Sequence, residues 1–120
     1  MTNSGHMTRT LLLSRSRPGT PFVSRGSASN KDLKAKDLAL GYSQIRSFNI
    51  SRFNDGDGPY DFLGGHVWGW VLRNSVGAAD DPVHGGIWSV ENSADQLHRD
   101  GRDIYTDNPG EELNSQLPRC

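Results

Sequence analysis

The most informative polar residues of the sequence stand where two short apolar runs end. Arg73 and Asn74 follow one run, and Glu91 and Asn92 close another. Arginine presents a planar fork of N–H donors that pairs with carboxylates in a bidentate manner, and an adjacent asparagine amide adds further donors. Because strands often present polar residues at their ends to a binding site, we expect a site here. A solvated charge at a strand end remains the alternative for Arg73.

The elements that must position these residues are mostly short strands. We predict strands over residues 10–15, 21–25, 44–50, 66–72, 75–79 and 86–91, with turns at 17–19 and 80–86. Residues 30–40 are predicted to be a helix, capped by Asn30 and stopped by Gly41, or else an ordered loop. Residues 92–110 read as a polar loop without periodicity. Short strands at roughly 10-residue spacing are typical of a β-propeller or a β-sandwich.

Composition limits what a chain of this length can do. It has 120 residues, of which 33% are apolar and 14 are glycine, which is little apolar material for a self-sufficient core. The 14 acidic and 13 basic side chains give a net charge of −1, whereas a nucleic-acid-binding protein usually shows a basic excess. No apolar run reaches the roughly 18 residues of a membrane span. We therefore expect neither nucleic acid nor membrane as a partner.

Cysteine usage and targeting signals add two expectations. Cys120 stands alone, so neither an internal disulfide nor a cysteine metal cluster is expected. The apolar run 11–13 is too short for the core of a signal peptide, and we expect no secretion signal in this chain. One glycosylation sequon occupies residues 49–51, although such tripeptides also occur by chance.

Several motifs in a fixed order carry a resemblance to a known family. They are LRNSVG at 72–77, PVHGGIWSVEN at 82–92 and DNPGEELN at 107–114, preceded by HMTRTLLLS at 6–14, VSRGSASN at 23–30 and SQIR at 43–46. With them the chain resembles the β-propeller sugar dehydrogenases that use pyrroloquinoline quinone (PQQ), in particular the fungal-type pyranose and sorbosone dehydrogenases. The resemblance extends over about residues 5–114.

The resemblance implies an all-β fold, a partial six-bladed β-propeller. Blades of that fold are four-stranded antiparallel sheets, so 120 residues suffice for about two of them. We assign residues 6–53 to one blade, 60–114 to the next and 115–120 to a tail. The complete enzyme would oxidise a pyranose or aldose sugar, whereas this chain alone is expected to be inactive.

The resemblance also implies a cofactor, a metal and residues that hold them. Arg73 and Asn74 would bind PQQ, which is a planar tricarboxylate orthoquinone. A calcium ion would polarise the quinone as a Lewis acid, held by the backbone carbonyls of Ser93 and Ala94. Better-known members have Gly-Pro at those two positions.

His6 would be the general base in this scheme. By resemblance it would take the proton of the anomeric hydroxyl while hydride passes to the quinone, and imidazole suits that task because it titrates near neutrality. An Asp precedes this His in bacterial members, where this chain has Gly5. His6 follows Gly5 and precedes Met7, so the alternative is a cloning remnant.

Other residues near these motifs have less specific readings. Glu91, Asp95 and Glu112 are nearby carboxylates that we read as surface acids. Trp68 and Trp70 could stack on a sugar, but alternating aromatics on a strand favour packing between blades.

Partners and alternatives complete the reading. The implied partners are a small-molecule sugar and an external electron acceptor, for instance a cytochrome domain, and the complete enzyme would be extracellular. Two other readings stay open: a non-catalytic carbohydrate-binding β module, and an inactive fragment from an incomplete gene reading.

Overall fold

The computed structural model describes residues 5–51, 53–54, 56–104 and 111–118. Strands and single-turn 3₁₀ helices (η) make up all its regular structure, so the all-β prediction is confirmed. In chain order they are β1 (Leu11–Leu13), β2 (Pro21–Arg25), η1 (Leu33–Lys36), η2 (Leu38–Leu40), β3 (Gln44–Ser47), η3 (Phe62–Gly64), β4 (His66–Trp70), β5 (Ser75–Asp80), β6 (Ile87–Glu91), β7 (His98–Arg99), β8 (Arg102–Asp103) and β9 (Glu112–Gln116). A search of these residues for a helix able to cross a membrane finds none.

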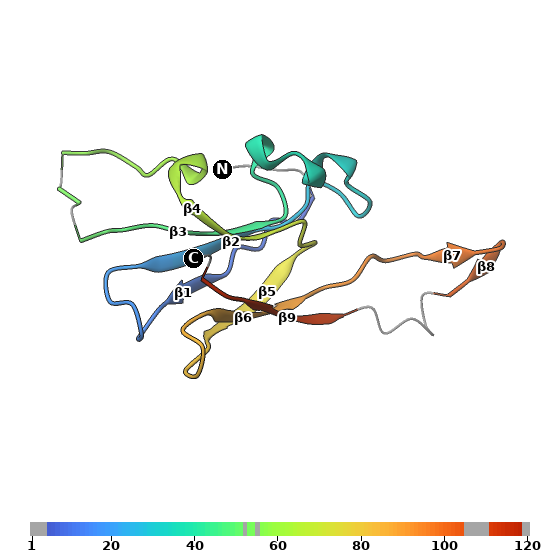
Figure 1. Cartoon of the computed structure of the whole chain (residues 1–120). Coiled ribbons are helices and arrows are strands. Elements are labelled where there is room, and N and C mark those ends of the chain that lie inside the picture. The colour runs from blue at the N-terminus through green and yellow to red at the C-terminus, as the bar shows by residue number, and fades with distance from the viewer. Residues whose placement is uncertain (1–4, 52, 55, 105–110, 119–120) are drawn as a thin grey trace.

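The first sheet is a four-stranded antiparallel meander in the order β1-β2-β3-β4 (Figure 1). Its first turn is the predicted one, since Thr20 N–H donates to the Arg17 carbonyl at 3.0 Å and Pro18 occupies the second position. Gly19 follows with a φ of 75°, a conformation that glycine adopts without steric cost. Strand β4 pairs with β3 in this sheet. Placing residues 66–70 with the strands that follow them was therefore wrong.

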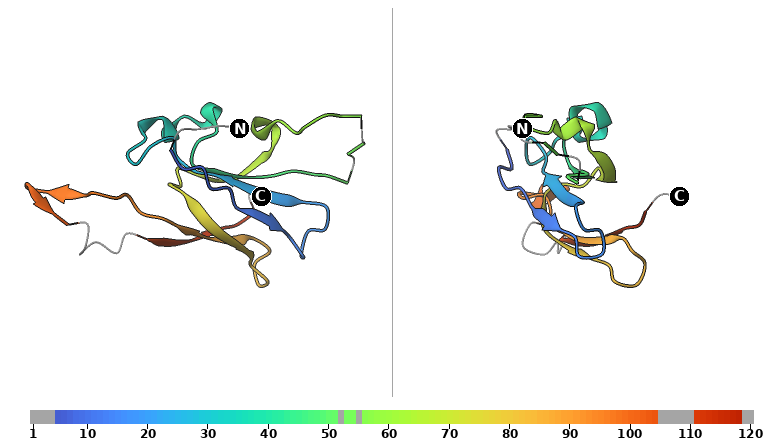
Figure 2. Two further views of the ribbon diagram at one scale, coloured as in Figure 1. Left: turned by 180° about the vertical axis from the view of Figure 1, so that it is seen from behind. Right: turned by 90° about the vertical axis from the view of Figure 1, so that its left-hand side faces the viewer.

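The second sheet contains β5, β6 and β9, all antiparallel. Between β6 and β9 the chain leaves the sheet, and the small hairpin β7–β8 projects well away from the rest of the molecule (Figures 1 and 2). The prediction of a polar loop over 92–110 missed this hairpin, and residues 105–110 lie outside the described part of the chain. Strand β9 was not predicted at all.

The predicted helix at 30–40 is two 3₁₀ turns instead. Asp32 caps η1 by accepting the N–H of Lys34, and Asp37 then ends that turn and caps η2 by accepting the N–H of Ala39. Asp37 has extended dihedral angles, which interrupt any continuous α-helix. Gly41 stops the segment in the left-handed region with a φ of 71°, as predicted.

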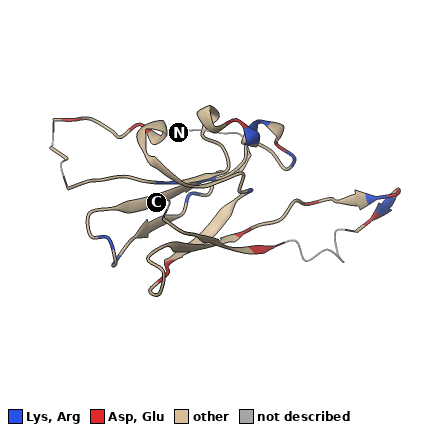
Figure 3. Cartoon of the chain, in the orientation of Figure 1, with Lys and Arg blue, Asp and Glu red and all other residues tan. Residues whose placement is uncertain are grey.

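The two sheets meet through a small apolar core. Phe22, Ile45 and Ile87 are almost fully buried there, and Trp68 packs edge-on against Phe22 with ring centroids 4.9 Å apart. Among the described residues, buried polar side chains outnumber buried apolar ones. Many of the charged residues lie in the turns and at the tip of the β7–β8 hairpin (Figure 3). Buried polar residues such as Ser24 of β2 and Ser75 of β5 meet at the junction between the sheets, and the candidate site lies there.

Candidate functional site

Arg73 and Asn74 lie where the chain crosses from β4 of the first sheet to β5 of the second (Figure 1). The crossing begins with Val71 at a φ of 62°, which is unusual for a β-branched residue. Leu72 then packs against the core and donates its N–H to the Ser43 carbonyl at 3.1 Å. Such backbone strain persists only where the surroundings hold it, and it is frequent at functional sites.

Both sheets hold the backbone of this crossing segment. Three consecutive carbonyls, those of Arg73, Asn74 and Ser75, accept hydrogen bonds from outside the segment. Their donors, in that order, are Ser27 N–H at 2.8 Å, Asn92 N–H at 3.0 Å, and the hydroxyls of Thr10 at 2.9 Å and Ser24 at 3.1 Å. Buried carbonyls that are fully paired have little freedom to move, so Arg73 and Asn74 are presented in one geometry.

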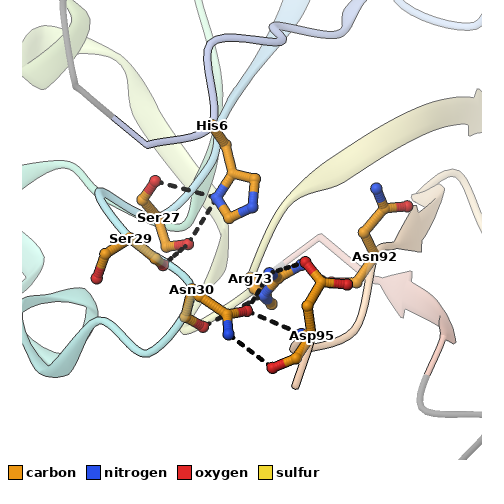
Figure 4. A network of polar contacts seen from close by, with 7 residues as sticks. All are labelled: His6, Ser27, Ser29, Asn30, Arg73, Asn92 and Asp95. Carbon is orange, nitrogen blue, oxygen red and sulfur yellow. Dashed lines mark hydrogen bonds and ion pairs between the residues drawn. The ribbon is translucent and has the colours of Figure 1, made fainter. Parts of the chain in front are cut away.

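The Arg73 guanidinium is held by neighbouring loops (Figure 4). Its donors reach the Asn30 side-chain oxygen at 2.6 Å, the Asn30 carbonyl at 3.4 Å and the Asn92 carbonyl at 3.0 Å. Within the described ranges its one carboxylate partner is Asp95, at 3.4 Å. The Asp95 side chain is 67% exposed against 16% for Arg73, and such exposed pairs contribute little. Arg73 therefore keeps positive charge that an anionic ligand could share.

Asn74 has a buried side chain that lacks a hydrogen-bond partner. The residue is 4% exposed, and its Oδ1 is fully buried with no partner among the residues that the structure describes. An unpaired buried polar atom costs about 1–3 kcal/mol, so it calls for a bound water or ligand group. Gly26 makes room at this point: a Cβ there would lie 2.4 Å from Asn74 Oδ1 and 2.9 Å from the Cβ of His6. Asn74 Oδ1 and the His6 Cβ thus both lie close to Gly26.

His6 is half-buried and fixed by Ser27 (Figure 4). Its Nδ1 lies 2.9 Å from the Ser27 hydroxyl and 3.2 Å from the Ser27 carbonyl, and its backbone N–H donates to that carbonyl at 3.3 Å. The other ring nitrogen faces away from Ser27. Since Ser27 also bonds the Arg73 carbonyl, one residue connects His6 to the crossing segment. The structure therefore places His6, Arg73 and Asn74 around Gly26 and Ser27, and their roles stay predictions.

Glu91 was read as a surface acid, and that reading is wrong. It is buried at the end of β6, where its Oε1 accepts the hydroxyls of Ser75 and, at 2.9 Å, Ser89. Its Oε2 is buried and has no partner within the described ranges. Burial raises the pKa of Glu91 above the usual carboxyl range, although hydrogen bonds from Ser75, Ser89 and the Asn74 backbone oppose the rise. Glu91 thus supports the strand ends that carry the site.

Ser93 and Ala94, the predicted calcium ligands, are half-buried in the loop after β6. The Asn92 carbonyl just before them accepts a hydrogen bond from Arg73, so this loop begins beside the site. No cluster of three or more His, Cys, Asp or Glu suited to a metal occurs in the described part of the chain. Backbone carbonyls are donors that calcium accepts, and the role of Ser93 and Ala94 stays a prediction.

Three residues of the site were missed as site residues: Gly26, Ser27 and Asn30. Asn30 was predicted to cap a helix, but it exchanges two hydrogen bonds with the Asp95 backbone, at 2.6 and 2.8 Å, and also binds Arg73. A signal was present, because all three belong to the motif VSRGSASN at 23–30.

Comparison with known proteins gives one family and several relatives. The family described as TrAA12-like matches residues 1–117. A PQQ-dependent sugar dehydrogenase of Hypocrea jecorina is 55% identical over 114 residues, which are 95% of this chain and 26% of that protein. A PQQ-dependent pyranose dehydrogenase of Coprinopsis cinerea is 37% identical over 117 residues, covering 94% of this chain and 16% of that protein.

Solved structures agree with the sequence relatives. The calcium structure of the Trichoderma reesei family AA12 protein superposes with a TM-score of 0.89 at 54% identity, over 98% of this chain and 29% of the other. The holo form of the PQQ domain of the Coprinopsis cinerea pyranose dehydrogenase gives a TM-score of 0.84 at 37% identity, over 98% of this chain and 30% of the other. The chain thus spans less than a third of each of these proteins.

Proposed function

Because the chain belongs to the TrAA12-like family, we propose that it supplies part of the active site of a PQQ-dependent oxidoreductase acting on a pyranose or other aldose sugar. The observation that carries the proposal is the convergence of His6, Arg73 and Asn74 around Gly26 and Ser27. The names of the relatives support the cofactor and the substrate class.

Arg73 and Asn74 are the proposed cofactor-binding residues. Within the described ranges the guanidinium has only the exposed Asp95 as a carboxylate partner, so it can also pair with a ligand carboxylate. The buried Asn74 Oδ1 is an acceptor without a partner in those ranges, so it fits an N–H or O–H donor of the ligand. PQQ, when bound, supplies the two-electron acceptor for the reaction. The carbonyls of Ser93 and Ala94 are the proposed calcium donors, where the ion would act as a Lewis acid.

His6 is the proposed general base. Its ring is held at Nδ1 and turned so that the other nitrogen faces away from Ser27 (Figure 4). A neutral imidazole in that position would take the proton of the sugar hydroxyl.

The proposal extends to the architecture. The sheet β1–β4 corresponds to one complete four-stranded blade of a six-bladed propeller, and β5, β6 and β9 to part of the next. An external electron acceptor and an extracellular location belong to the same proposal.

A chimaera tests the function, with this chain replacing the matching segment of the Hypocrea jecorina dehydrogenase. We expect PQQ-dependent dye reduction with an aldose, and a loss of about 10²–10⁴-fold in kcat for His6→Ala, because a general base contributes about that much. PQQ and calcium affinities, measured by calorimetry, should stay near those of the unaltered chimaera.

Two outcomes would contradict this function. A chimaera that binds sugar by calorimetry but reduces no dye would favour the carbohydrate-binding module. An unchanged kcat in the His6→Ala chimaera would show that His6 is not the general base. His84→Ala is the matched control, because His84 pairs with Asp81 in the β5–β6 turn.

A further inference from the structure

The contacts of the His6 ring define where its hydrogen must lie. Among the residues that the structure describes, Nδ1 has two oxygen neighbours, the Ser27 carbonyl at 3.2 Å and the Ser27 hydroxyl at 2.9 Å. A carbonyl oxygen only accepts hydrogen bonds, so the first contact requires a hydrogen on Nδ1. The second contact is undecided by itself, because a hydroxyl both donates and accepts.

The neighbouring Ser29 carbonyl decides the second contact. The Ser27 hydroxyl lies 2.8 Å from that carbonyl, which only accepts, and it therefore gives its single hydrogen to Ser29 (Figure 4). Toward His6 the same hydroxyl oxygen is then an acceptor. Both neighbours of Nδ1 thus call for an Nδ1–H donor, and the chain of donors runs from His6 to Ser27 to Ser29.

Gly5 bears on whether a carboxylate could orient the ring instead. A Cβ at Gly5 would lie 2.1 Å from the Ala28 carbonyl oxygen and 2.8 Å from the Ser29 N–H nitrogen. Those neighbours are backbone atoms, so an acidic side chain cannot enter beside His6 without displacing the 27–29 segment that holds the ring. Position 5 is therefore closed to any side chain while the 27–29 segment keeps its place.

We infer that Ser27 is the positioning residue of the site: it holds neutral His6 as the Nδ1–H tautomer and leaves Nε2 as the proton acceptor. A neutral hydroxyl and carbonyl perform this orientation in place of a carboxylate. The inference rests on the proposed function for the use of Nε2 as a base, but the tautomer itself is a property of this chain alone.

Nitrogen NMR tests the inference without any turnover. The full chain, and the chimaera described above, are labelled with ¹⁵N-histidine, and the His6 signals are assigned by their loss in His6→Gln. Long-range ¹H–¹⁵N correlation then tells which ring nitrogen bears the hydrogen at a pH where the ring is neutral. We expect a hydrogen on Nδ1 and a bare Nε2.

Variants separate the hydroxyl from the backbone. Ser27→Ala should lower the fraction of the Nδ1–H tautomer, since only the Ser27 carbonyl is left as acceptor, and Ser27→Thr should restore it. Ser29→Ala is the matched control: it should change nothing, because Ser29 contributes only its carbonyl.

Three results would overturn the inference. They are an Nε2–H tautomer in the unaltered protein, an unchanged tautomer ratio in Ser27→Ala, and an averaged, unstructured His6 signal in both the chain and the chimaera. An Nδ1–H tautomer in a chimaera that reduces no dye would instead keep this inference and contradict the proposed function.

Discussion

At the residue scale, Arg73 combines two tasks that a substitution can separate. It ties Asn30 to the loop at Asn92, and it offers charge to a ligand. In the chimaera, Arg73→Ala should weaken PQQ binding by about 2–5 kcal/mol, because it removes one partner of a desolvated charge pair. Arg73→Lys should restore only part of this, since an ammonium lacks the planar fork.

The PQQ titration of these variants needs a control for the loss of charge alone. Arg99→Ala on the exposed β7–β8 hairpin provides it and should bind PQQ normally. Normal PQQ affinity in Arg73→Ala would show that Arg73 does not bind the cofactor.

Glu91 gives the site a pH dependence of stability. Burial raises its folded-state pKa above the ordinary value of 4.5. The folded protein therefore binds a proton at Glu91 more tightly than the unfolded chain does. The contribution of this proton to the free energy of unfolding is fully present below pH 4.5 and is lost as the pH rises through the raised pKa. Glu91→Gln keeps an oxygen for Ser75 and Ser89 but has no charge to bury.

The variant should therefore gain stability relative to the parent as the pH rises. Urea midpoints of the two chimaeras, measured on both sides of pH 4.5 and up to neutrality, test this. Glu111→Gln, at an exposed position, should track the parent throughout. A difference between Glu91→Gln and the parent that does not change with pH would contradict the buried ionisation.

At the scale of elements, the site depends on how closely the segment after β2 approaches the crossing between the sheets. Gly26→Ala would put a methyl group 2.4 Å from Asn74 Oδ1 and 2.9 Å from the His6 Cβ. We expect the substitution to lower the free energy of unfolding by roughly 1–3 kcal/mol, as overpacking does, and to reduce both PQQ affinity and kcat. Gly64→Ala in η3 meets nothing within 4 Å and should leave all three unchanged.

Elements whose pattern is local were predictable from the sequence. Strand β6 alternates buried Ile87, Ser89 and Glu91 with exposed positions, and β2 follows a Pro-Gly turn, so both were predicted with nearly their observed bounds. Strand β9 lacks apolar alternation and is set by its pairing with β6, which no local pattern contains. The helix predicted over 30–40 does not form, because Asp37 ends η1 and caps η2.

The same division holds for the site. Arg73, Asn74 and His6 were singled out because motifs carry them, and their roles stay predictions. Their partners Ser27 and Asn30 were not assigned, because they act through contacts between residues 21 to 65 positions apart in the chain. Burial of Glu91 arises from the packing of two sheets, which a charge pattern does not reveal.

At the scale of the whole molecule, the chain exposes surfaces that a compact domain would cover. Its radius of gyration is 15.7 Å, against about 14 Å for a compact domain of this length. The first sheet has an apolar groove of about 400 Å³. On the second sheet Val90 and its cross-strand neighbour Leu113 border another of about 230 Å³. In the proposed propeller, neighbouring blades would pack on such faces.

The face of the second sheet is exposed in the isolated chain and would be covered in the chimaera, so one substitution there should have different effects in the two proteins. Val90 is 43% exposed in this chain, so Val90→Ser should reduce self-association of the isolated 120 residues by removing part of an apolar patch. In the chimaera the same face would be covered, and Val90→Ser should lower the unfolding free energy by about 1.5–3 kcal/mol, the contribution of a buried valine. Light scattering and thermal unfolding measure the two effects.

Val83 provides the matched control, because it is 78% exposed in the β5–β6 turn and lies outside both grooves. Val83→Ser should change neither association nor stability by a comparable amount. If Val90→Ser left the chimaera as stable as the parent, the second sheet would have a free face in the longer protein too. The assignment of β5, β6 and β9 to a blade with a neighbour would then fail, while the pairing of the strands and the site at the crossing would stand.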